Sequence, residues 1–314
     1  MTRRVLLDCD PGHDDAMAII VAARYADLVG ITTVAGNAPL ERTTRNALVM
    51  RDLLGIDVPV HSGSPQPLLG PVGHGAVHSI AVHGESGLDG ADLPPPITPI
   101  DGTDGVGFII DTCRNIDDVW LVGVGPLTNI ALALRTAPDI AGRIAGISLM
   151  GGGTFGNRTT TGEFNVWADP EAASIVFDYG GPLVMAGLDV THQFQATPER
   201  ITAIEALPGA LAGVLADLLT FFSANYLSRH DPGSIRGAAM HDPLAVLALT
   251  HPDLFGRVAR QVVIETRGEH TRGMTVIDHR AITARPAPNC DMLTTVDHDA
   301  AFELLTAAIA HFSH

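Results

Sequence analysis

Apolar positions along the chain follow two alternating patterns. Short continuous runs, such as VLL at 5–7, are typical of buried strands, whereas segments such as AMAIIVAARYA at 16–26 space apolar residues at helical intervals. Strands are predicted at Arg4–Asp8, Leu28–Ala35, Asp118–Val122, Ile144–Met150, Leu183–Gly187, Arg260–Thr266 and Met274–Ile277. Helices are predicted at His13–Ala26, Leu40–Leu54, Gly105–Asn115, Leu127–Thr136, Pro170–Tyr179, Pro198–Leu207, Leu211–Ser228, Pro243–Thr250 and Ala300–His314. This alternation predicts an α/β fold with a single open, mainly parallel sheet and helices on both faces.

Domain organisation follows from the length and from the distribution of Gly and Pro. With 314 residues, 46% of them hydrophobic, the chain can bury a large core. No internal repeat or low-complexity linker divides it, so we predict one domain spanning residues 1–314. Residues 59–99 are rich in Gly and Pro and form one long irregular segment. Long loops of compact domains are often functional, so this segment is expected to be a mobile part of the active site.

The overall charge narrows the range of ligands. A net charge of −16 lacks the basic footprint of a protein that binds nucleic acid or an anionic membrane surface. No apolar run approaches the roughly 18–20 residues of a membrane helix. Arg3 and Arg4 precede only three apolar residues, too few for the core of a signal peptide. We therefore expect a cytoplasmic protein that binds a small neutral or cationic ligand.

Two residue types limit the possible chemistry. The three cysteines, Cys9, Cys113 and Cys290, show no CxxC spacing, which favours reduced thiols. All 19 residues in the Lys and Arg count are arginine. A Walker-type phosphate loop, a Schiff-base enzyme, a pyridoxal enzyme and a Ser-Lys hydrolase all need a lysine amine, so these four classes are excluded.

The stretch DCDPGHDD at 8–15 places four aspartates and one histidine within eight positions. It lies between the first predicted strand and the first predicted helix, with Pro11 and Gly12 as turn residues. Ligands of open α/β sheets bind at this carboxyl edge. Crowded carboxylates repel one another unless a positive charge lies between them. An all-oxygen cluster favours a hard cation such as Ca²⁺ or Mg²⁺ over Zn²⁺.

Further polar segments follow later predicted strands or open a helix. They are AGN at 35–37, GVGPLTN at 123–129, GGGTFGNRTTTGEFNVWADPEAA at 151–173 and AMHDPLA at 239–245. Because the carboxyl ends of parallel strands meet at one edge of a sheet, we expect these segments to converge on DCDPGHDD.

These motifs together resemble those of the nucleoside N-ribohydrolases of the inosine/uridine-preferring family. The resemblance rests on DCDPGHDDAMAI at 8–19, AGN at 35–37, HGESGLDG at 83–90, GPLTNIALA at 125–133, GEFNVWADPEAA at 162–173 and HDPLA at 241–245. They occur in family order over most of the chain. The resemblance implies a Rossmann-like nucleoside hydrolase fold, a homo-oligomer (dimer or tetramer), and calcium-dependent hydrolysis of ribonucleosides to ribose and free base.

The resemblance also implies roles at the reacting bond. It makes Asp10, Asp15 and Asp242 side-chain ligands of Ca²⁺ and adds the backbone carbonyl of Val124. A valine replaces the threonine often found at this last position, which a backbone ligand tolerates. Asp10 is also the expected general base, since a carboxylate beside the metal can take a proton from the attacking water. His241 resembles the acid that protonates the leaving base.

Further residues are expected to contact the substrate. The positions that match ribose contacts in the family are Asp14, Asn37, Asn157, Glu163 and Asn165. His83 matches a catalytic histidine on the base side, whereas His13 is expected to be structural. Only 5% of the residues are aromatic; the candidates near the base are Phe164, Trp167, Phe222 and Tyr226, with His230 one helical turn beyond Tyr226. Few aromatic rings favour a pyrimidine or a mixed inosine/uridine preference.

Two other interpretations remain open. A magnesium-dependent phosphatase of the haloacid-dehalogenase type also places DxD after its first strand. However, it needs a downstream basic residue for the phosphoryl group, and here Pro-Gly replaces its DxDx[TV] continuation. The second alternative is a ribonucleoside-binding protein without turnover, and the intact Asp10 and His241 argue against it.

Overall fold

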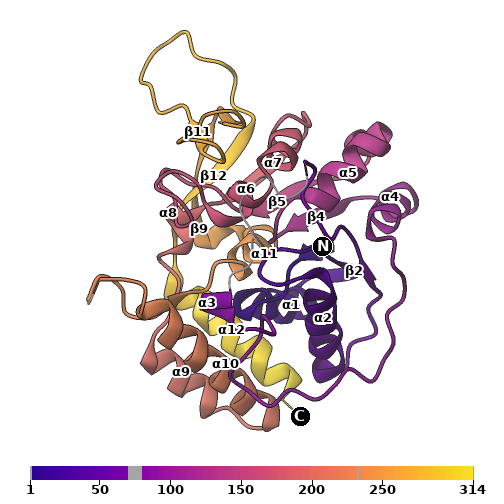
Figure 1. Cartoon of the computed structure of the whole chain (residues 1–314), viewed down its shortest axis with the longest axis vertical. Helices are drawn as coiled ribbons and strands as arrows, with labels where there is room; N and C mark the ends of the chain where they lie inside the picture. Colours follow the sequence, from indigo (N-terminus) through magenta and orange to yellow (C-terminus); the bar gives the residue numbers. More distant parts are fainter. Residues whose placement is uncertain (1, 70–79, 232, 314) are drawn as a thin grey trace.

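An eight-stranded sheet forms the centre of the computed structural model, which describes residues 2–69, 80–231 and 233–313 (Figure 1). Its strand order is β3 (Val60–Ser62), β2 (Asp27–Thr33), β1 (Arg4–Cys9), β4 (Val119–Gly123), β5 (Gly146–Met150), β6 (Leu183–Ala186), β12 (Cys290–Val296) and β9 (Phe255–Arg260). Neighbouring strands pair in parallel, except that β12 and β9 are antiparallel. The predicted open, mainly parallel sheet is confirmed.

Helices cover both faces of this sheet. In chain order they are α1 (His13–Tyr25), α2 (Leu40–Leu54), α3 (Ile80–His83), α4 (Gly105–Asn115), α5 (Thr128–Thr136), α6 (Phe164–Ala168), α7 (Pro170–Phe177), α8 (Leu188–Thr191), α9 (Pro198–Glu205), α10 (Ala210–Leu227), α11 (Pro243–Thr250) and α12 (His298–Phe312). Figure 1 shows α4, α5 and α7 on one side of the sheet and α1, α2, α10 and α12 on the other. Short 3-10 turns, η1 (Pro138–Gly142) and η2 (Pro252–Leu254), complete the helical elements among the described residues.

Strand β1 separates two hydrophobic cores. Val5 and Leu7 pack into the core under α1, α10, α11 and α12, whereas Leu6 packs into the core under α4, α5 and α7. Successive side chains of a strand point to opposite faces, so a strand with helices on both sides must be apolar throughout. This explains why the run VLL is continuous rather than alternating.

The predicted strands at 260–266 and 274–277 do not join the central sheet. They form the antiparallel pair β10 (Val262–Ile264) and β11 (Thr275–Ile277) instead, and the segment from there to β12 projects from the body (Figure 1). A second small pair joins β7 (Gln195–Ala196) and β8 (Ala238–Ala239). The sheet is completed by β3, β9 and β12, which the hydrophobic pattern does not predict. On β9, partly buried positions alternate with exposed ones after the buried Phe255, as expected of an edge strand with one covered face.

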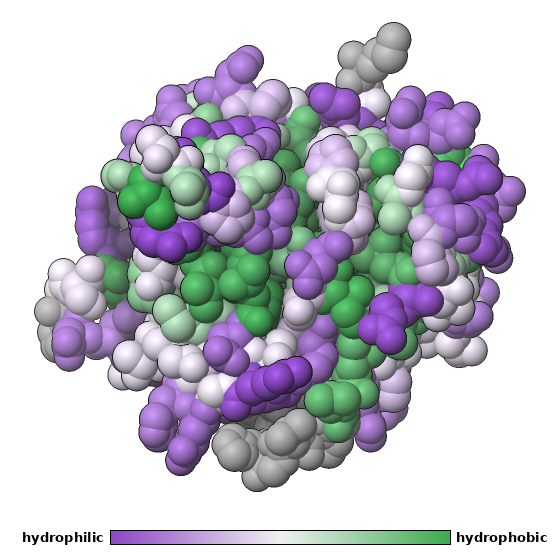
Figure 2. Space-filling view, turned by 90° about the horizontal axis from the view of Figure 1, so that it is seen from above, coloured by the Kyte–Doolittle hydropathy of each residue, from purple (hydrophilic) through white to green (hydrophobic). Residues whose placement is uncertain are grey.

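Helix α10 is long and apolar enough to cross a membrane by length and composition, contrary to the expectation of no such segment. Half of it is buried in the protein, and Leu215, Leu219 and Phe222 are in the core beneath the sheet. Its apolar composition is therefore accounted for by core packing. On the face shown in Figure 2, hydrophobic surface lies toward the middle, surrounded by hydrophilic residues.

Candidate active site

The acidic loop between β1 and α1 is held in place by one of its own carboxylates. Asp15 accepts hydrogen bonds from the backbone N–H groups of Asp10 and Gly12, each at 3.0 Å. The amide of Asn37 donates to the same carboxylate at 3.1 Å and to the carbonyl of Asp10 at 3.2 Å. Asp15 is thus a helix-capping acid at the N-terminus of α1, where the helix dipole favours negative charge.

Asp10 is fully buried in a cradle made by glycines. Its Oδ2 accepts the backbone N–H of Asn37 at 2.6 Å, while Oδ1 has no hydrogen-bond partner among the described residues. A Cβ atom at Gly36 would overlap Oδ2, and one at Gly125 would overlap Oδ1. The motifs AGN and GVGPLTN therefore need these glycines because the carboxylate of Asp10 occupies the space of their missing side chains.

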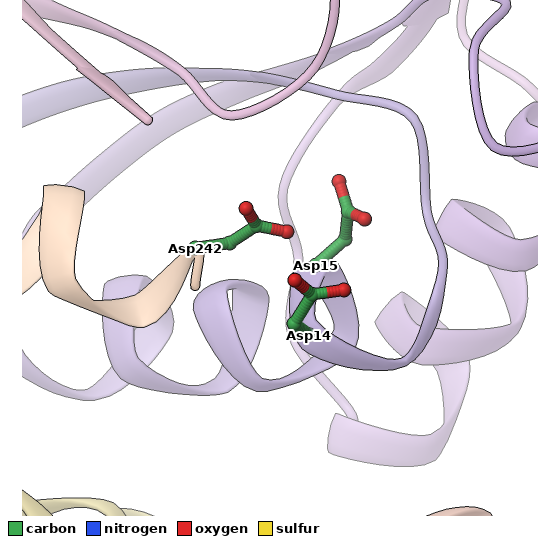
Figure 3. A group of neighbouring side chains, drawn as sticks. All are labelled: Asp14, Asp15 and Asp242. Carbon is green, nitrogen blue, oxygen red and sulfur yellow. The ribbon is translucent and has the colours of Figure 1, made fainter. Parts of the chain in front are cut away.

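Asp15 and two further aspartates form a buried cluster next to this cradle. Asp14, Asp15 and Asp242 each offer a carboxylate oxygen, and these atoms lie within 4.8 Å of one another. Figure 3 shows the first two at the start of α1 and the third at the start of α11, with their carboxylates directed into a common space. The convergence of the first and last acidic motifs is confirmed.

The negative charges of these buried carboxylates favour a bound cation. Burial and then the charge of Asp15 raise the pKa of Asp14 to about 8. Burial, followed by the charges of neighbouring carboxylates, also raises the pKa of Asp10 and of Asp242 well above the usual value. Four buried carboxylates stay ionised at neutral pH only if positive charge compensates them. Together with the orphaned Oδ1 of Asp10, the donor set fits a metal ion bound through oxygen.

The residues of the EFN motif support the wall of the site. The amide of Asn165 donates to the carbonyl oxygen of Val124 at 2.9 Å and to that of Met150 at 3.2 Å. Glu163 caps α6: its carboxylate accepts the backbone N–H groups of Gly152, Asn165 and Val166 at 3.0 to 3.2 Å. Glu163 is therefore fully engaged with the backbone, and Asn165 orients the carbonyl of Val124.

A cavity of about 100 Å³ lies over the acidic cluster. The residues that line it are Asp14, Asn37, Val82, His83, Val124, Met150, Asn157, Glu163, Phe164, Asn165, Phe222, Tyr226, His241 and Asp242. Apart from Trp167, which lies under the guanidinium of Arg158, all the predicted site residues except Asp10, Asp15 and His230 line this cavity. The first two lie next to it, bonded to Asn37, and His230 stacks on the ring of Tyr226 with 4.6 Å between centroids. Of the 59–99 segment, Val82 and His83 reach the cavity, whereas residues 70–79 lie outside the described part.

His241 is held from two sides. Its Nδ1 lies 2.7 Å from the hydroxyl of Thr191 and its Nε2 lies 3.5 Å from the hydroxyl of Tyr226. Burial, and then the charges of His192 and His230, lower the pKa of His241 well below its usual value. One nitrogen of this buried imidazole is directed toward a tyrosine at the cavity wall.

A pair of histidines, His13 and His83, contributes another part of the cavity wall. His83 lines the cavity, and its Nδ1 lies 3.0 Å from Nδ1 of the buried His13. The ring of Phe222 stacks with both imidazoles, at 5.1 Å from His13 and 5.2 Å from His83. Burial lowers the pKa of His13 to about 4 and, followed by the charge of His13, that of His83 well below its usual value.

Sequence reasoning missed two residues beside His241. Thr191 bonds it, and His192 lies with its ring centroid 5.5 Å away. The Nε2 atom of His192 is buried and has no hydrogen-bond partner among the described residues. Both follow β6 at its carboxyl end, so the rule that collects polar residues after strands would have found them if applied to the strand at 183–187.

An open parallel sheet with a buried oxygen-ligand cation site and a histidine-lined cavity at its carboxyl edge defines a metal-binding α/β enzyme. The model of the family described as "Inosine-uridine preferring nucleoside hydrolase" matches residues 5–303. The chain belongs to this family of nucleoside-hydrolysing enzymes, and the resemblance noted in the sequence is confirmed.

Individual relatives match over their whole length. The "Pyrimidine-specific ribonucleoside hydrolase RihA" of Enterobacter sp. (strain 638) is 39% identical, covering 100% of this chain and 99% of the relative. The protein of the same description from Escherichia coli (strain SMS-3-5 / SECEC) is 40% identical over 100% of both. The solved structure of the "Purine-Preferring Ribonucleoside Hydrolase from Gardnerella vaginalis" superposes with a TM-score of 0.91 at 32% identity, covering 99% of each chain.

Proposed function

We propose that this nucleoside hydrolase is calcium-dependent and cleaves the N-glycosidic bond of ribonucleosides, with a preference for pyrimidine bases over purine bases. The observation that carries the proposal is the placement of a buried carboxylate with an orphaned oxygen, Asp10, beside the cavity that His241 lines. Relatives with pyrimidine-specific descriptions at 39–40% identity support the base preference. A mixed inosine/uridine preference is the alternative outcome.

The metal ligands in this proposal are the carboxylates of Asp10, Asp15 and Asp242 and the carbonyl of Val124. Their donor atoms are all oxygens, which suits Ca²⁺, a hard cation with six to eight oxygen ligands. When bound there, the ion supplies charge that orients a water molecule and the ribose hydroxyls. Asn165 and Asn37 hold the carbonyl and the loop of this set in position through the hydrogen bonds already described.

Asp10 is the proposed general base. N-glycoside cleavage passes through an oxocarbenium-like state, so a water must lose a proton as it attacks one side of C1′. The Oδ2 atom of Asp10 is occupied by the N–H of Asn37, which leaves Oδ1 to accept that proton. His241 donates a proton to the departing base on the other side, and the hydroxyl of Tyr226 lies beside its Nε2.

The ribose is proposed to bind through Asp14, Asn37, Asn157, Glu163 and Asn165, which share the cavity wall. Because Glu163 and Asn165 are engaged with the backbone, their main contribution is to hold the carbonyl of Val124 and the start of α6 in place. Polar groups paired with a ribose hydroxyl lose their partner in a deoxyribonucleoside, so such substrates should be rejected strongly.

The nucleobase is proposed to lie between His83, Phe164 and Tyr226. His230 acts from behind Tyr226, where it stacks on the phenol ring and bonds the backbone carbonyl of Tyr226 at 2.8 Å. Phe222 contacts the histidine pair and Tyr226 rather than presenting a free face for a large base. A site with this few open rings suits a single-ring base.

The remaining properties are also proposals. The chain forms one domain, and the segment 59–99 belongs to the active site, to which its described part contributes Val82 and His83. It works in the cytoplasm as a homo-oligomer, a dimer or tetramer, without nucleic-acid or membrane partners. Light scattering at micromolar concentration tests the oligomeric state, and a monomer would contradict it.

Release of reducing sugar tests the function. Uridine, cytidine, inosine, adenosine and thymidine are each incubated with and without a calcium chelator, followed by calcium re-addition. We expect chelator-sensitive release, fastest from uridine or cytidine and absent from thymidine. Equal release with the chelator rejects calcium, and faster release from inosine rejects the pyrimidine preference. Binding without any release, or release of phosphate from sugar phosphates instead, overturns the hydrolase proposal in favour of one of its two alternatives.

A further inference from the structure

His13 lies behind the base side of the cavity and contacts the histidine that lines it. Its ring is completely buried, Nδ1 lies 3.0 Å from Nδ1 of His83, and Nε2 lies 2.8 Å from the carbonyl oxygen of Asp89. The two imidazoles also stack, with 5.2 Å between centroids. A Cβ atom at Gly12 would lie 2.7 Å from Nδ1 of His83, so the glycine of the PGHDD motif makes room for this contact.

The contact with Asp89 determines which nitrogen of His13 carries its proton. A carbonyl oxygen only accepts hydrogen bonds, so Nε2 of His13 must be the donor. Burial favours the neutral imidazole, which has one donor and one acceptor nitrogen. Nδ1 of His13 is therefore an acceptor, and Nδ1 of His83 must donate to it.

A second and longer contact of Nδ1 of His83 would favour the opposite tautomer of this histidine. The backbone N–H of His13 lies 3.3 Å from Nδ1 of His83 and donates to it only if that nitrogen carries no proton. In that state two lone pairs would face each other across 3.0 Å, between His13 and His83. The shorter contact and the avoided repulsion both favour a proton on Nδ1 of His83.

We propose that His13 is a positioning residue that holds His83 in the tautomer protonated on Nδ1, so that Nε2 of His83 accepts a hydrogen bond from the nucleobase. This inference rests on the proposed function and deepens it. A pyrimidine fits such an acceptor if it presents a ring N–H, as uracil does, or an amino group, as cytosine does. His83 then selects the substrate by its base edge, while His241 remains the acid.

The tautomer of His83 is measured directly on the full chain. Long-range ¹H–¹⁵N correlation spectra with ring-labelled histidine distinguish the two tautomers, and His83→Gln assigns the signal. In the wild-type protein at neutral pH we expect the proton on Nδ1 of His83. In His13→Phe, which keeps a ring stacked on Phe222 but has no nitrogen, we expect the proton to move at least partly to Nε2.

A matched control is His61→Phe. His61 also stacks on a phenylalanine, Phe108, with 4.0 Å between centroids, but belongs to β3 and is not among the residues that line the cavity. This variant should leave the tautomer of His83 unchanged. A proton on Nε2 of His83 in the wild-type protein overturns the inference, even if His13→Phe fails to fold. An unchanged tautomer in a folded His13→Phe also overturns it.

A substrate pair links the tautomer to specificity. The wild-type enzyme should favour uridine over 3-methyluridine, which lacks the ring N–H, by about tenfold or more in kcat/KM, since a buried acceptor is left unpaired. His13→Phe should narrow this ratio, and an unchanged ratio would reject the role in specificity. If no ribonucleoside is hydrolysed, the proposed function fails, whereas the spectra still report on the tautomer independently.

Discussion

The backbone N–H of Asn37 donates to Oδ2 of Asp10 across 2.6 Å, which leaves Oδ1 of the same carboxylate without a partner among the described residues. Two oxygens of one group thereby acquire different roles. One fixes the side chain to the AGN loop, and the other is available for a water or a cation. Asp8 also has one oxygen without a partner in the described part of the chain; Asp10 is the proposed base because it is hydrogen-bonded to Asn37, which lines the cavity.

Replacing Asp10 by Asn should remove the base while keeping its shape. We expect kcat to fall by about 10²- to 10⁴-fold, the usual contribution of a general base, with ribose still bound. Steady-state kinetics and calorimetric titration with ribose measure the two effects. Asp169→Asn is the matched control, because Asp169 is a fully buried acid that caps α7 away from the cavity. That variant should lose stability without a comparable loss of kcat, and an unaltered rate in Asp10→Asn would reject the assignment.

Replacing Gly125 by Ala should damage the same carboxylate without touching a polar group. The new Cβ would overlap Oδ1 of Asp10, so the side chain must shift from its cradle. We expect at least about a tenfold loss of kcat, since small misplacements of catalytic groups are costly. Gly213→Ala is the control, because its Cβ meets no atom within 4 Å and lies in α10. Equal activity of the two variants would contradict the cradle.

The central strands can be predicted from sequence because they are buried on both faces. β1 and β5 are almost continuously apolar, as strands covered on both faces must be. The edge strand β9 and its neighbour β12 carry exposed polar residues such as Arg257 and Thr295 between buried or partly buried ones, so their pattern resembles that of a loop. Their place in the sheet depends on pairing with each other and with β6, which a local pattern does not encode.

The site residues that belong to short motifs directly after a strand can also be predicted from the sequence. Residues within short motifs after a strand, such as Asp10 and Asn37, stay close to the sheet edge whatever the rest of the chain does. Thr191 belongs to no motif and becomes significant only because the fold places its hydroxyl 2.7 Å from Nδ1 of His241. The EFN motif identifies Glu163, but its role as a helix cap depends on backbone geometry that residue spacing alone does not reveal.

Removing one carboxylate from the buried cluster should have opposite effects with and without metal. Asp242 lies beside Asp14 and Asp15, and this crowding is unfavourable without a cation. Asp242→Asn should therefore raise the melting temperature in chelator. The wild-type protein should gain about 5 °C or more at a calcium concentration roughly a hundred times the Kd, and the variant should lose most of that gain. Scanning calorimetry measures both, with exposed Asp139→Asn as the control that retains the gain.

The three cysteines should be unreactive in the folded protein. Burial raises the pKa of Cys113 and of Cys290 to about 12, and burial followed by nearby aspartates raises that of Cys9 well above its usual value. The reactive thiolate is therefore scarce at pH 8. A colorimetric disulfide reagent should label almost no thiol in the native protein and three per chain in guanidinium. Rapid labelling of native protein would contradict this expectation.

The same pKa shifts predict how stability changes at alkaline pH. Above about pH 9 the unfolded chain releases thiol protons that the folded chain retains until about pH 12. Unfolding therefore becomes more favourable as the pH rises, by up to about 1.4 kcal/mol per pH unit for each thiol. Urea melts of the wild-type protein and of Cys113→Ala between pH 8 and pH 10 test this slope, which should be smaller in the variant.

Thr191 should matter for the rate more than for substrate binding. Its hydroxyl lies 2.7 Å from Nδ1 of His241, and its side chain is fully buried. Thr191→Val keeps the shape but removes this hydrogen bond, which is worth about 1 kcal/mol, so kcat should fall by roughly five- to tenfold with little change in KM. Thr191→Ser retains the hydroxyl and should restore most of the rate. If valine and serine have the same kcat, Thr191 only packs, and His241 is oriented by Tyr226 and by the backbone of the HDP motif instead.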